Sequence, residues 1–405
     1  MTDKTKSSVK QPRYKKPSIF VYFILWIAAL YAKIRFRIRT NREEIKAARK
    51  VKSPVLVLGN HSSPIDFIFM VHTLFPKRLG FVVAAGLYYD KRYAWAIKLL
   101  GGAIPKKQFS TDYSVVKNVK KMTDAGVSIG IYPEGRCSMD GRESPISEAI
   151  YKLIKWLKIP VIMVCAEGAY LSRPRYATDF RRGQVKVSVK TILGEGEAET
   201  LSLEEIKERL LSNMKYNDFK YQRENNIRVK GKKGTTVGVE RLIYKCPKCK
   251  AEFKHITEGN FLHCTACENH VELTEYGELI VADGDKAFDR LDLWYDYQKE
   301  QLKKEAEDPD YSWAATVSMY VNDEDAGKHI FKTKGTLAIN RDGYLFNGED
   351  GTALSFKIGP IPSAAIILEE NVMQFYREDD IYRFVFEGEE KPVKFEIAES
   401  ILGGR

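Results

Sequence analysis

The chain has 405 residues, of which 44% are hydrophobic, so it is long enough for two or three domains with a full-sized core. Its formal net charge of +11 is concentrated at one end, because residues 1–50 carry fourteen Lys and Arg residues against three acidic residues. A nucleic-acid-binding protein more often carries its charge on a folded face, so we expect no nucleic acid partner. The basic end is interpreted either as an arm that binds an anionic membrane surface or as a solubilising tail.

An apolar segment follows this basic arm, which we assign to residues 1–17. It runs from Ile19 to Ala32 and has basic residues on both sides. As a helix it would cover roughly 21 Å, which is short of the about 30 Å hydrocarbon core of a bilayer. We therefore predict that residues 18–40 associate with a membrane peripherally or monotopically, lying in or dipping into one leaflet. A buried core helix is the alternative, and a secretory signal peptide is disfavoured because no small-x-small cleavage site follows.

Residues 41–225 form one predicted domain, in which apolar strand-like runs alternate with helical stretches. This alternation favours an α/β layered core with a mainly parallel sheet. The expected strands lie at 55–58, 81–85, 128–132 and 161–164, with an edge strand at 184–191. The expected helices lie at 64–74, 93–100, 112–123 and 147–157, with a closing helix at 203–214.

The first chemically suggestive block is Asn60 to Asp66, directly after the strand at 55–58. Two serines followed by Pro64 predict that a helix begins here, since serine is a good N-cap and proline suits the first helical position. His61 would then lie in the strand–helix loop, and Asp66 in the first helical turn could hold its imidazole in one tautomer. With an ordinary pKa near 6.5, His61 would be a competent general base for a substrate hydroxyl. The alternative is a loop histidine without a catalytic role.

Two further blocks carry charges suited to a phosphate. A Gly-Gly turn delivers Lys106 and Lys107, and the segment Tyr132 to Gly141 follows the strand at 128–132. Proline and glycine around Glu134 predict a tight loop at the carboxyl end of that strand, where ligands bind in open α/β sheets. Glu134 is suited to accept a hydrogen bond from a glycerol hydroxyl, and Lys106, Lys107 or Arg136 to bind a phosphate.

Taken in order, these blocks and an Ile-Pro-Val strand at 159–164 resemble the lysophosphatidate (1-acylglycerol-3-phosphate) acyltransferase family. That family's signature is His-x4-Asp, a Gly-containing block with a basic residue, Phe-Pro-Glu-Gly-Thr-Arg-Ser and a Val/Ile-Pro-Val strand. The resemblance covers about residues 51–193 and implies a catalytic pair of His61 and Asp66. It implies acyl transfer from acyl-CoA or acyl-carrier protein to the free hydroxyl of a lysophospholipid, with 1-acylglycerol-3-phosphate foremost. The predicted substrate-binding residues are Asn60, Lys106, Lys107, Glu134, Gly135, Arg136 and Ser138.

The chain departs from the family pattern at two positions. Arg136 and Cys137 stand where the family has Thr-Arg, so the arginine is displaced by one, and lysines with Gln108 replace the usual arginine of the second block. Lysine and arginine do not bind phosphate identically, so the acceptor stays open to another lysophospholipid, a lyso-aminolipid or a glycolipid. A different class, a non-catalytic membrane-docked regulatory protein, also stays open.

Two other nucleophile patterns can be weighed. Gly126-Val-Ser128-Ile-Gly130 matches the nucleophile elbow of serine hydrolases, but that motif requires a strand before the serine and a helix after it. Here a predicted helix precedes Ser128 and the strand runs on from it, so we reject a serine hydrolase. Cys137 suggests a thiol nucleophile, yet no pairing of this cysteine with a histidine can be read from the sequence.

The other notable cysteines form two Cys-x-x-Cys pairs within residues 226–280. This spacing predicts a zinc ribbon, and four thiolates would saturate a structural zinc ion; the predicted ligands are Cys246, Cys249, Cys264 and Cys267. His255, His263 or His270 could replace a cysteine, although surface histidines are the simpler reading. Because such thiols favour a reducing compartment, we expect the working parts to face the cytoplasm.

The last part of the chain is expected to be mainly β. Residues 281–310 are charged and helix-prone, which predicts a helical linker, and residues 311–405 show short strands with turn signals. The hairpin at 334–346 resembles the start of a pleckstrin-homology or GRAM-like domain, and a plain β barrel without a ligand is an equal alternative. No feature of the sequence selects an oligomeric state.

Overall fold

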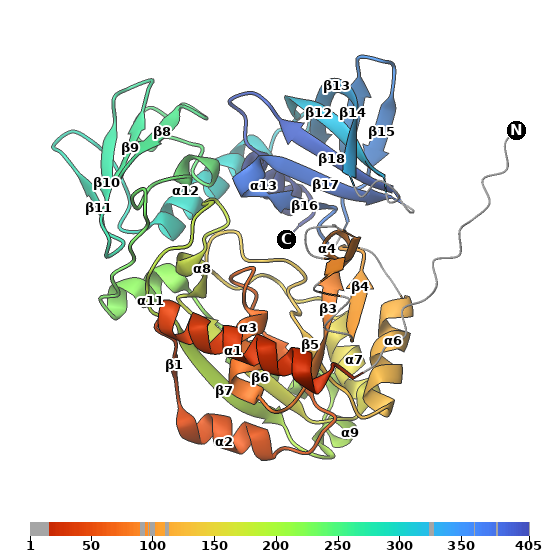
Figure 1. The fold of residues 1–405 in the computed structure, drawn as a ribbon. Helices are drawn as coiled ribbons and strands as arrows, with labels where there is room; N and C mark the ends of the chain where they lie inside the picture. The colour runs from red at the N-terminus through yellow and green to blue at the C-terminus, as the bar shows by residue number, and fades with distance from the viewer. Residues whose placement is uncertain are drawn as a thin grey trace, which may run out of the picture.

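The structure is a computed structural model that describes residues 16–89, 94–95, 97, 102–109, 113–323, 328–359, 361–377 and 380–404. Most of the predicted basic arm and of the helix expected at 93–100 lies outside the described residues. Three β-sheets succeed one another along the chain, and Figure 1 shows them as three separate layers of strands.

The first sheet has seven strands and confirms the predicted mainly parallel arrangement. All of its neighbouring pairs are parallel except β6 with β7. In spatial order the strands are β1 (Arg39–Thr40), β7 (Lys186–Leu193), β6 (Val161–Glu167), β2 (Leu56–Gly59), β5 (Ser128–Ile131), β3 (Leu79–Ala84) and β4 (Ala103–Lys106). The strand β4 was not expected, because Gly, Ala and Pro around it have low strand propensity.

Helices cover both faces of this sheet, because alternate strand residues point to opposite sides. Leu56 and Leu58 of β2 contact the cluster formed with α6, α7 and α10, whereas Val57 contacts the cluster formed with α2 and α3. The helices around this sheet are α1 (Ile19–Arg35), α2 (Arg42–Lys50), α3 (Phe67–Leu74), α4 (Ala85–Tyr89), α6 (Tyr113–Asp124), α7 (Ala149–Leu157), α8 (Ala169–Ser172), α9 (Glu197–Thr200), α10 (Leu203–Met214) and α11 (Asp218–Glu224).

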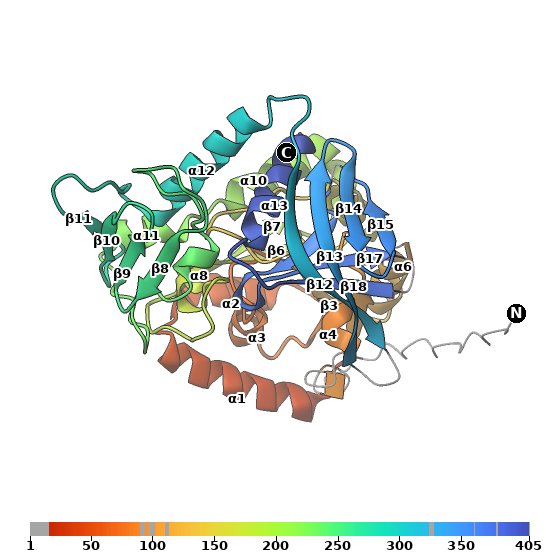
Figure 2. The ribbon, with the colours of Figure 1, turned by 90° about the horizontal axis from the view of Figure 1, so that it is seen from above.

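Helix α1 contains the predicted membrane-associating segment, and Figure 2 shows it along the periphery of the molecule. Its buried face carries Tyr22, Ala29 and Ala32, which pack on the α/β core. The opposite face exposes large apolar side chains at Ile19, Phe20, Phe23, Ile24, Ile27, Tyr31 and Ile34. No helix in the described part of the chain is both long and apolar enough to cross a membrane.

The second sheet contains the cysteine pairs and is small and antiparallel. A 3-10 turn, η1 (Val239–Arg241), precedes it, and its strands in spatial order are β11 (Leu279–Val281), β10 (His270–Leu273), β9 (Phe261–Cys264) and β8 (His255–Glu258). The stretch before it is fixed to the α/β core, since the backbones of Arg182 and Lys230 exchange two hydrogen bonds of 2.8 and 2.9 Å.

The third sheet forms the C-terminal part with helix α13 (Pro392–Leu402). It is antiparallel, with the 3-10 turn η2 (Leu368–Glu370), and its strands in spatial order are β15 (Ala353–Phe356), β14 (Gly343–Gly348), β13 (Lys328–Asn340), β12 (Trp313–Asp323), β18 (Asp380–Phe386), β17 (Val372–Arg377) and β16 (Ala364–Ile367). The expected antiparallel β region is therefore present. Its likeness to a pleckstrin-homology or GRAM domain stays a prediction.

Helix α12 (Leu291–Glu305) occupies the expected helical linker, and six of its fifteen residues are buried. Trp294 is fully buried and donates its indole N–H to the carbonyl of Lys245 at 2.9 Å. One hydrophobic cluster runs from Tyr170 in α8 through Trp294 to Phe395 in α13. The C-terminal half is consequently packed against the α/β core through one continuous hydrophobic cluster.

Candidate active site

The predicted catalytic loops meet because their strands are neighbours. β2 and β5 pair in parallel, so the loop after Gly59 and the loop after Ile131 leave the same edge of the sheet. Ser128 begins β5 after helix α6, and its hydroxyl accepts the backbone N–H of Val55 at 3.1 Å. This order of elements confirms that the Gly-x-Ser-x-Gly match is not a nucleophile elbow.

His61 and Asp66 lie together as the first block predicts. Nδ1 of His61 is 3.1 Å from Oδ2 of Asp66, which also accepts the backbone N–H of Ser63 at 2.8 Å. The helix expected from Pro64 begins only at Phe67, with Asp66 at its N-cap position. The Asp66 carboxylate therefore stabilises a short turn before the helix. This turn places the imidazole of His61 beside the carboxylate.

Glu134 links the loop after β2 to the loop after β5 through hydrogen bonds. Its Oε1 accepts the backbone N–H of His61 at 2.7 Å, and its Oε2 accepts that of Ser144 at 2.8 Å and lies 3.4 Å from the hydroxyl of Tyr216. Burial raises the pKa of Glu134 to about 7, while these backbone hydrogen bonds act in the opposite direction. Both carboxylate oxygens are thus engaged within the protein.

Asn60, Gly135 and Ser138 shape the same loops. The amide of Asn60 donates to the carbonyl of Ala166 and accepts its N–H, both at 2.7 Å. The backbone N–H of Ser138 donates to the carbonyl of His61 at 2.6 Å. Gly135 has φ of +70°, a left-handed conformation in which a glycine is favoured.

Cys137 is a site residue that the sequence analysis did not pair with a histidine. Its Sγ lies 3.5 Å from Nδ1 and 3.4 Å from Nε2 of His61, and Arg175 donates to its carbonyl at 3.0 Å. The ring of Tyr132 stacks on His61 with centroids 4.4 Å apart. The sequence did indicate that the loops of His61 and Cys137 both follow strands. It does not indicate that these two strands are neighbours in the sheet, so the contact could not be predicted.

The charges around His61 change its protonation. Burial lowers its pKa, but the charge and hydrogen bond of Cys137 and those of Asp66 outweigh burial and raise the pKa to about 10. The ordinary pKa near 6.5 expected from the sequence is therefore corrected. The charges beside the ring therefore favour the imidazolium form of His61 at neutral pH.

The predicted phosphate-binding lysines lie at the same end of the sheet but farther along it. Lys106 ends β4, which is three strands from β2 and hence roughly 14 Å away at the usual strand spacing. Its Nζ donates to the carbonyl of Lys107 at 3.2 Å. The next side chain, Gln108, donates to the carbonyl of Gly135 at 3.1 Å and so ties this block to the Glu134 loop.

Arg136 contacts the C-terminal part of the chain. Its guanidinium lies 2.9 Å from Oε1 of Glu396 in α13, and the hydroxyl of Tyr295 donates to Oε2 of Glu396 at 2.8 Å. Burial lowers the pKa of Arg136, but the charge of Glu396 outweighs it and raises the pKa. Glu396 could not be predicted as a partner of Arg136 from the sequence, because it lies 260 residues farther along the chain and belongs to no motif.

Comparison with known proteins places this site in a family domain. Residues 33–167 match the family model described as Acyltransferase, and this stretch includes both His61 and Glu134. The chain therefore contains an acyltransferase domain. Two chloroplastic 1-acyl-sn-glycerol-3-phosphate acyltransferases, from Brassica napus and Arabidopsis thaliana, are each 24% identical to the chain over 149 residues.

These alignments cover 35% of this chain and 42% and 40% of the two plant proteins. The chain thus spans less than half the length of the curated relatives it matches. The crystal structure of the 1-acyl-sn-glycerophosphate acyltransferase from Thermotoga maritima is 17% identical, with a TM-score of 0.41 over 48% of this chain and 77% of that chain.

Outside the acyltransferase domain, the two cysteine pairs form one cluster. Its four sulfur atoms lie within 4.8 Å of one another, and the cross-pair distances are 3.7 Å for Cys246 to Cys267 and 3.8 Å for Cys249 to Cys264. A tetrahedron of Zn–S bonds of about 2.3 Å has edges of about 3.8 Å, so the cluster fits zinc. His255 is buried and contacts the carbonyl of Ile243, so it is not the surface histidine that was expected.

Proposed function

We propose that this chain is a glycerolipid O-acyltransferase that moves a fatty acyl group from acyl-CoA or acyl-carrier protein to the free hydroxyl of a lysophospholipid. The acceptor proposed first is 1-acylglycerol-3-phosphate. The observation that carries the proposal is the His61–Asp66 pair, with 3.1 Å between its atoms, inside a domain that matches the acyltransferase family model.

In the proposed reaction, neutral His61 accepts the proton of the acceptor hydroxyl through Nε2. Asp66 holds Nδ1, which fixes the tautomer and stabilises the imidazolium that forms. The alkoxide then attacks the thioester carbonyl and the donor thiolate leaves. Because Cys137 and Asp66 raise the pKa of His61, the surroundings of the ring set the pH range in which His61 can act as this base.

We divide the predicted substrate-binding residues into two groups. Asn60, Glu134 and Ser138 make buried hydrogen bonds within the loops, which supports a positioning role for them beside Gly135. The cations at this end of the sheet are suited to the acceptor phosphate: Lys106, Lys107 and Arg136. Binding through Arg136 requires that Glu396 share or release its guanidinium.

We propose that the exposed apolar face of α1 binds the cytoplasmic membrane surface. Seven large apolar side chains recur on this face at helical spacing, and Lys33 and Arg35 lie in its last turn. A helix with this pattern lies in the membrane interface with its apolar face toward the acyl chains. Such a peripheral or monotopic placement would present the active site to lysolipids.

We also propose that the four cysteines bind a structural zinc ion. Cys246, Cys249, Cys264 and Cys267 would supply four thiolates, which leaves no coordination position for water or substrate. When bound, the metal would hold the small sheet together and take no part in acyl transfer.

The test is a transfer assay with labelled acyl-CoA and acyl-carrier-protein donors in detergent micelles. The acceptors are 1-acylglycerol-3-phosphate, lysophosphatidylethanolamine and a lysoglycolipid. Wild type should acylate at least one of them, whereas His61→Ala should not, with an unchanged circular dichroism spectrum. His329→Ala, an exposed histidine of β13, is the matched control and should retain full activity.

A non-catalytic membrane-docked regulator is the second candidate, and the Arg136–Glu396 pair favours it because a phosphate-binding arginine is already occupied. Absence of transfer from both donors to every acceptor would favour this candidate. Transfer that is equal in wild type and His61→Ala would contradict the proposed mechanism.

A further inference from the structure

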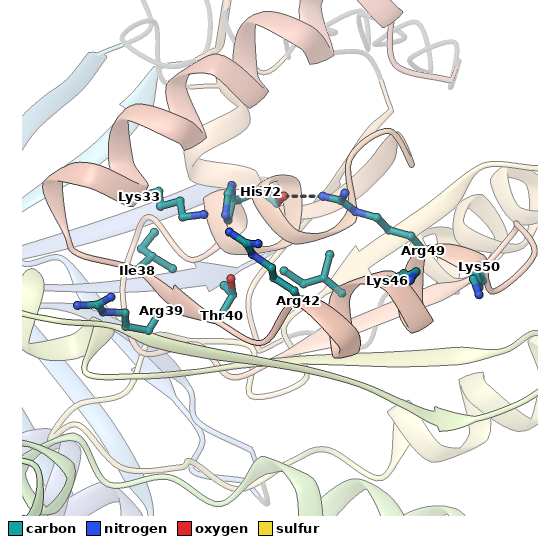
Figure 3. A pocket seen from close by; sticks show the side chains of 10 residues that line it. Lys33, Ile38, Arg39, Thr40, Arg42, Lys46, Arg49, Lys50 and His72 are labelled. Atoms are coloured by element: carbon teal, nitrogen blue, oxygen red, sulfur yellow. Dashed lines mark hydrogen bonds between the residues drawn. The ribbon is translucent and has the colours of Figure 1, made fainter.

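A pocket of about 670 Å³ lies beneath helix α1 (Figure 3), and none of the candidate active-site residues lines it. It is bounded by the last turn of α1, strand β1, helix α2 and the last turn of α3. Six of its ten lining residues are cationic: Lys33, Arg39, Arg42, Lys46, Arg49 and Lys50. No carboxylate is among the lining residues, so the wall of the pocket is positively charged.

His72 forms part of the pocket wall and shows the effect of this charge. It is 6% exposed, and its Nδ1 is buried without a hydrogen-bond partner within the described structure. Burial first, and then the charges of Lys33 and Arg49, lower its pKa to about 4. A buried polar nitrogen without a partner is costly, and it is therefore unusual in a site that binds nothing.

Arg49 is anchored in a way that orients the site. Its Nε donates to the carbonyl of Thr73 at 2.8 Å, and its second nitrogen donates to the carbonyl of His72 at 3.3 Å, the contact dashed in Figure 3. The backbone carbonyls at the end of α3 thus fix the Arg49 guanidinium in the wall of the pocket. The labelled side chains of Arg42 and Lys33 extend toward His72 in the same view.

We propose that this pocket binds a phosphoryl group. A phosphate offers several negative oxygens to the flexible lysines and to arginine forks, and one of its oxygens could meet the unpartnered nitrogen of His72. Two sources share this chemistry, an anionic lipid headgroup and a soluble phosphate. The apolar face of α1 ends at Ile34 beside Lys33, which favours the lipid headgroup.

The first test measures the pKa of His72 by NMR of histidine-labelled full-length protein, with His72→Gln used to assign its signal. Inorganic phosphate or pyrophosphate should raise this pKa from about 4 toward its ordinary value of about 6.5, because a bound anion offsets the neighbouring cations. Arg42→Glu/Lys46→Glu should abolish the rise. The matched control is Lys117→Glu/Lys121→Glu, the same charge change at the same spacing on α6, which should leave the rise intact.

The second test separates the two sources by sedimentation with vesicles. Phosphatidate-containing vesicles should bind the wild type and the α6 control more tightly than phosphatidylcholine vesicles, and Arg42→Glu/Lys46→Glu should lose most of that difference. Binding of soluble phosphate without any preference for phosphatidate would overturn the lipid source. A His72 pKa that no phosphate probe moves would overturn the site itself.

Discussion

The two ends of helix α3 hold two histidines in opposite electrostatic surroundings. His61, just before the helix, lies among Asp66 and Cys137, and its pKa is raised to about 10. His72, in the last turn, lies among Lys33 and Arg49, and burial with these charges lowers its pKa to about 4. The two side chains are identical, so their surroundings alone make one a candidate for proton transfer and the other a neutral wall of an anion site.

The two histidines also differ in where along the chain their charged neighbours lie. Asp66 is five residues from His61, whereas Cys137 comes from the loop after the neighbouring strand β5. Around His72 the cations come from α1, β1 and α2, which precede it in the chain. The following measurements test whether the two histidines differ in this way.

The largest effect is expected at the His61 end. Asp66→Asn should lower kcat by roughly 10³-fold or more, because the neutral amide no longer stabilises the imidazolium or fixes its tautomer. Steady-state kinetics with the preferred lysolipid would measure this. Asp124→Asn, the same change on the exposed end of α6, is the control. Equal activity of the two variants would show that the charge beside His61 is not used.

A substitution in the cysteine cluster, remote from both histidines, gives a reference for the size of their effects on stability. Cys264→Ser should remove the bound zinc, because three thiolates hold it far more weakly, and should lower the Tm by several degrees. Elemental analysis and calorimetry would measure the two quantities. Cys165→Ala should keep its zinc. Full zinc content in Cys264→Ser would contradict the assignment of this cluster.

The pH dependence of stability tests the two pKa shifts directly. The raised pKa of His61 contributes stability that is complete below about 6.5 and is lost as the pH rises to about 10. The lowered pKa of His72 does the opposite, since the folded state is destabilised as the pH falls from about 6.5 to about 4. Urea unfolding between these limits should therefore lose its alkaline slope in His61→Ala and its acidic slope in His72→Gln. His329→Ala should alter neither slope.

The smallest effect is expected from freeing Arg136 from Glu396. Glu396→Gln should weaken the hold on Arg136 and lower the KM for a phosphate-bearing acceptor by roughly threefold to tenfold. Asp296→Asn, which removes one of the two carboxylates that pair with Arg142, is the control. An unchanged KM in Glu396→Gln would mean that Arg136 does not meet the acceptor phosphate.

Features with a short range in the sequence could be predicted from it. Alternating apolar residues predicted the parallel sheet, because each strand buries both faces under helices and the pattern is local. The loop between β2 and α3 brought His61 to Asp66, and each Cys-x-x-Cys turn brought two thiols together. The start of α3 was predicted three residues too early, because the carboxylate of Asp66 holds a turn where serine capping was expected.

Local patterns in the sequence were thus enough to predict the class of the core, the His61–Asp66 pair and the cysteine cluster. The folded chain was needed to show that Cys137 lies beside His61, that Glu396 pairs with Arg136, and that six cations line one pocket with His72. The physical reason is the range of the interactions. Turn and helix geometry fix residues a few positions apart, whereas the order of strands and the packing of domains depend on the burial of the whole chain.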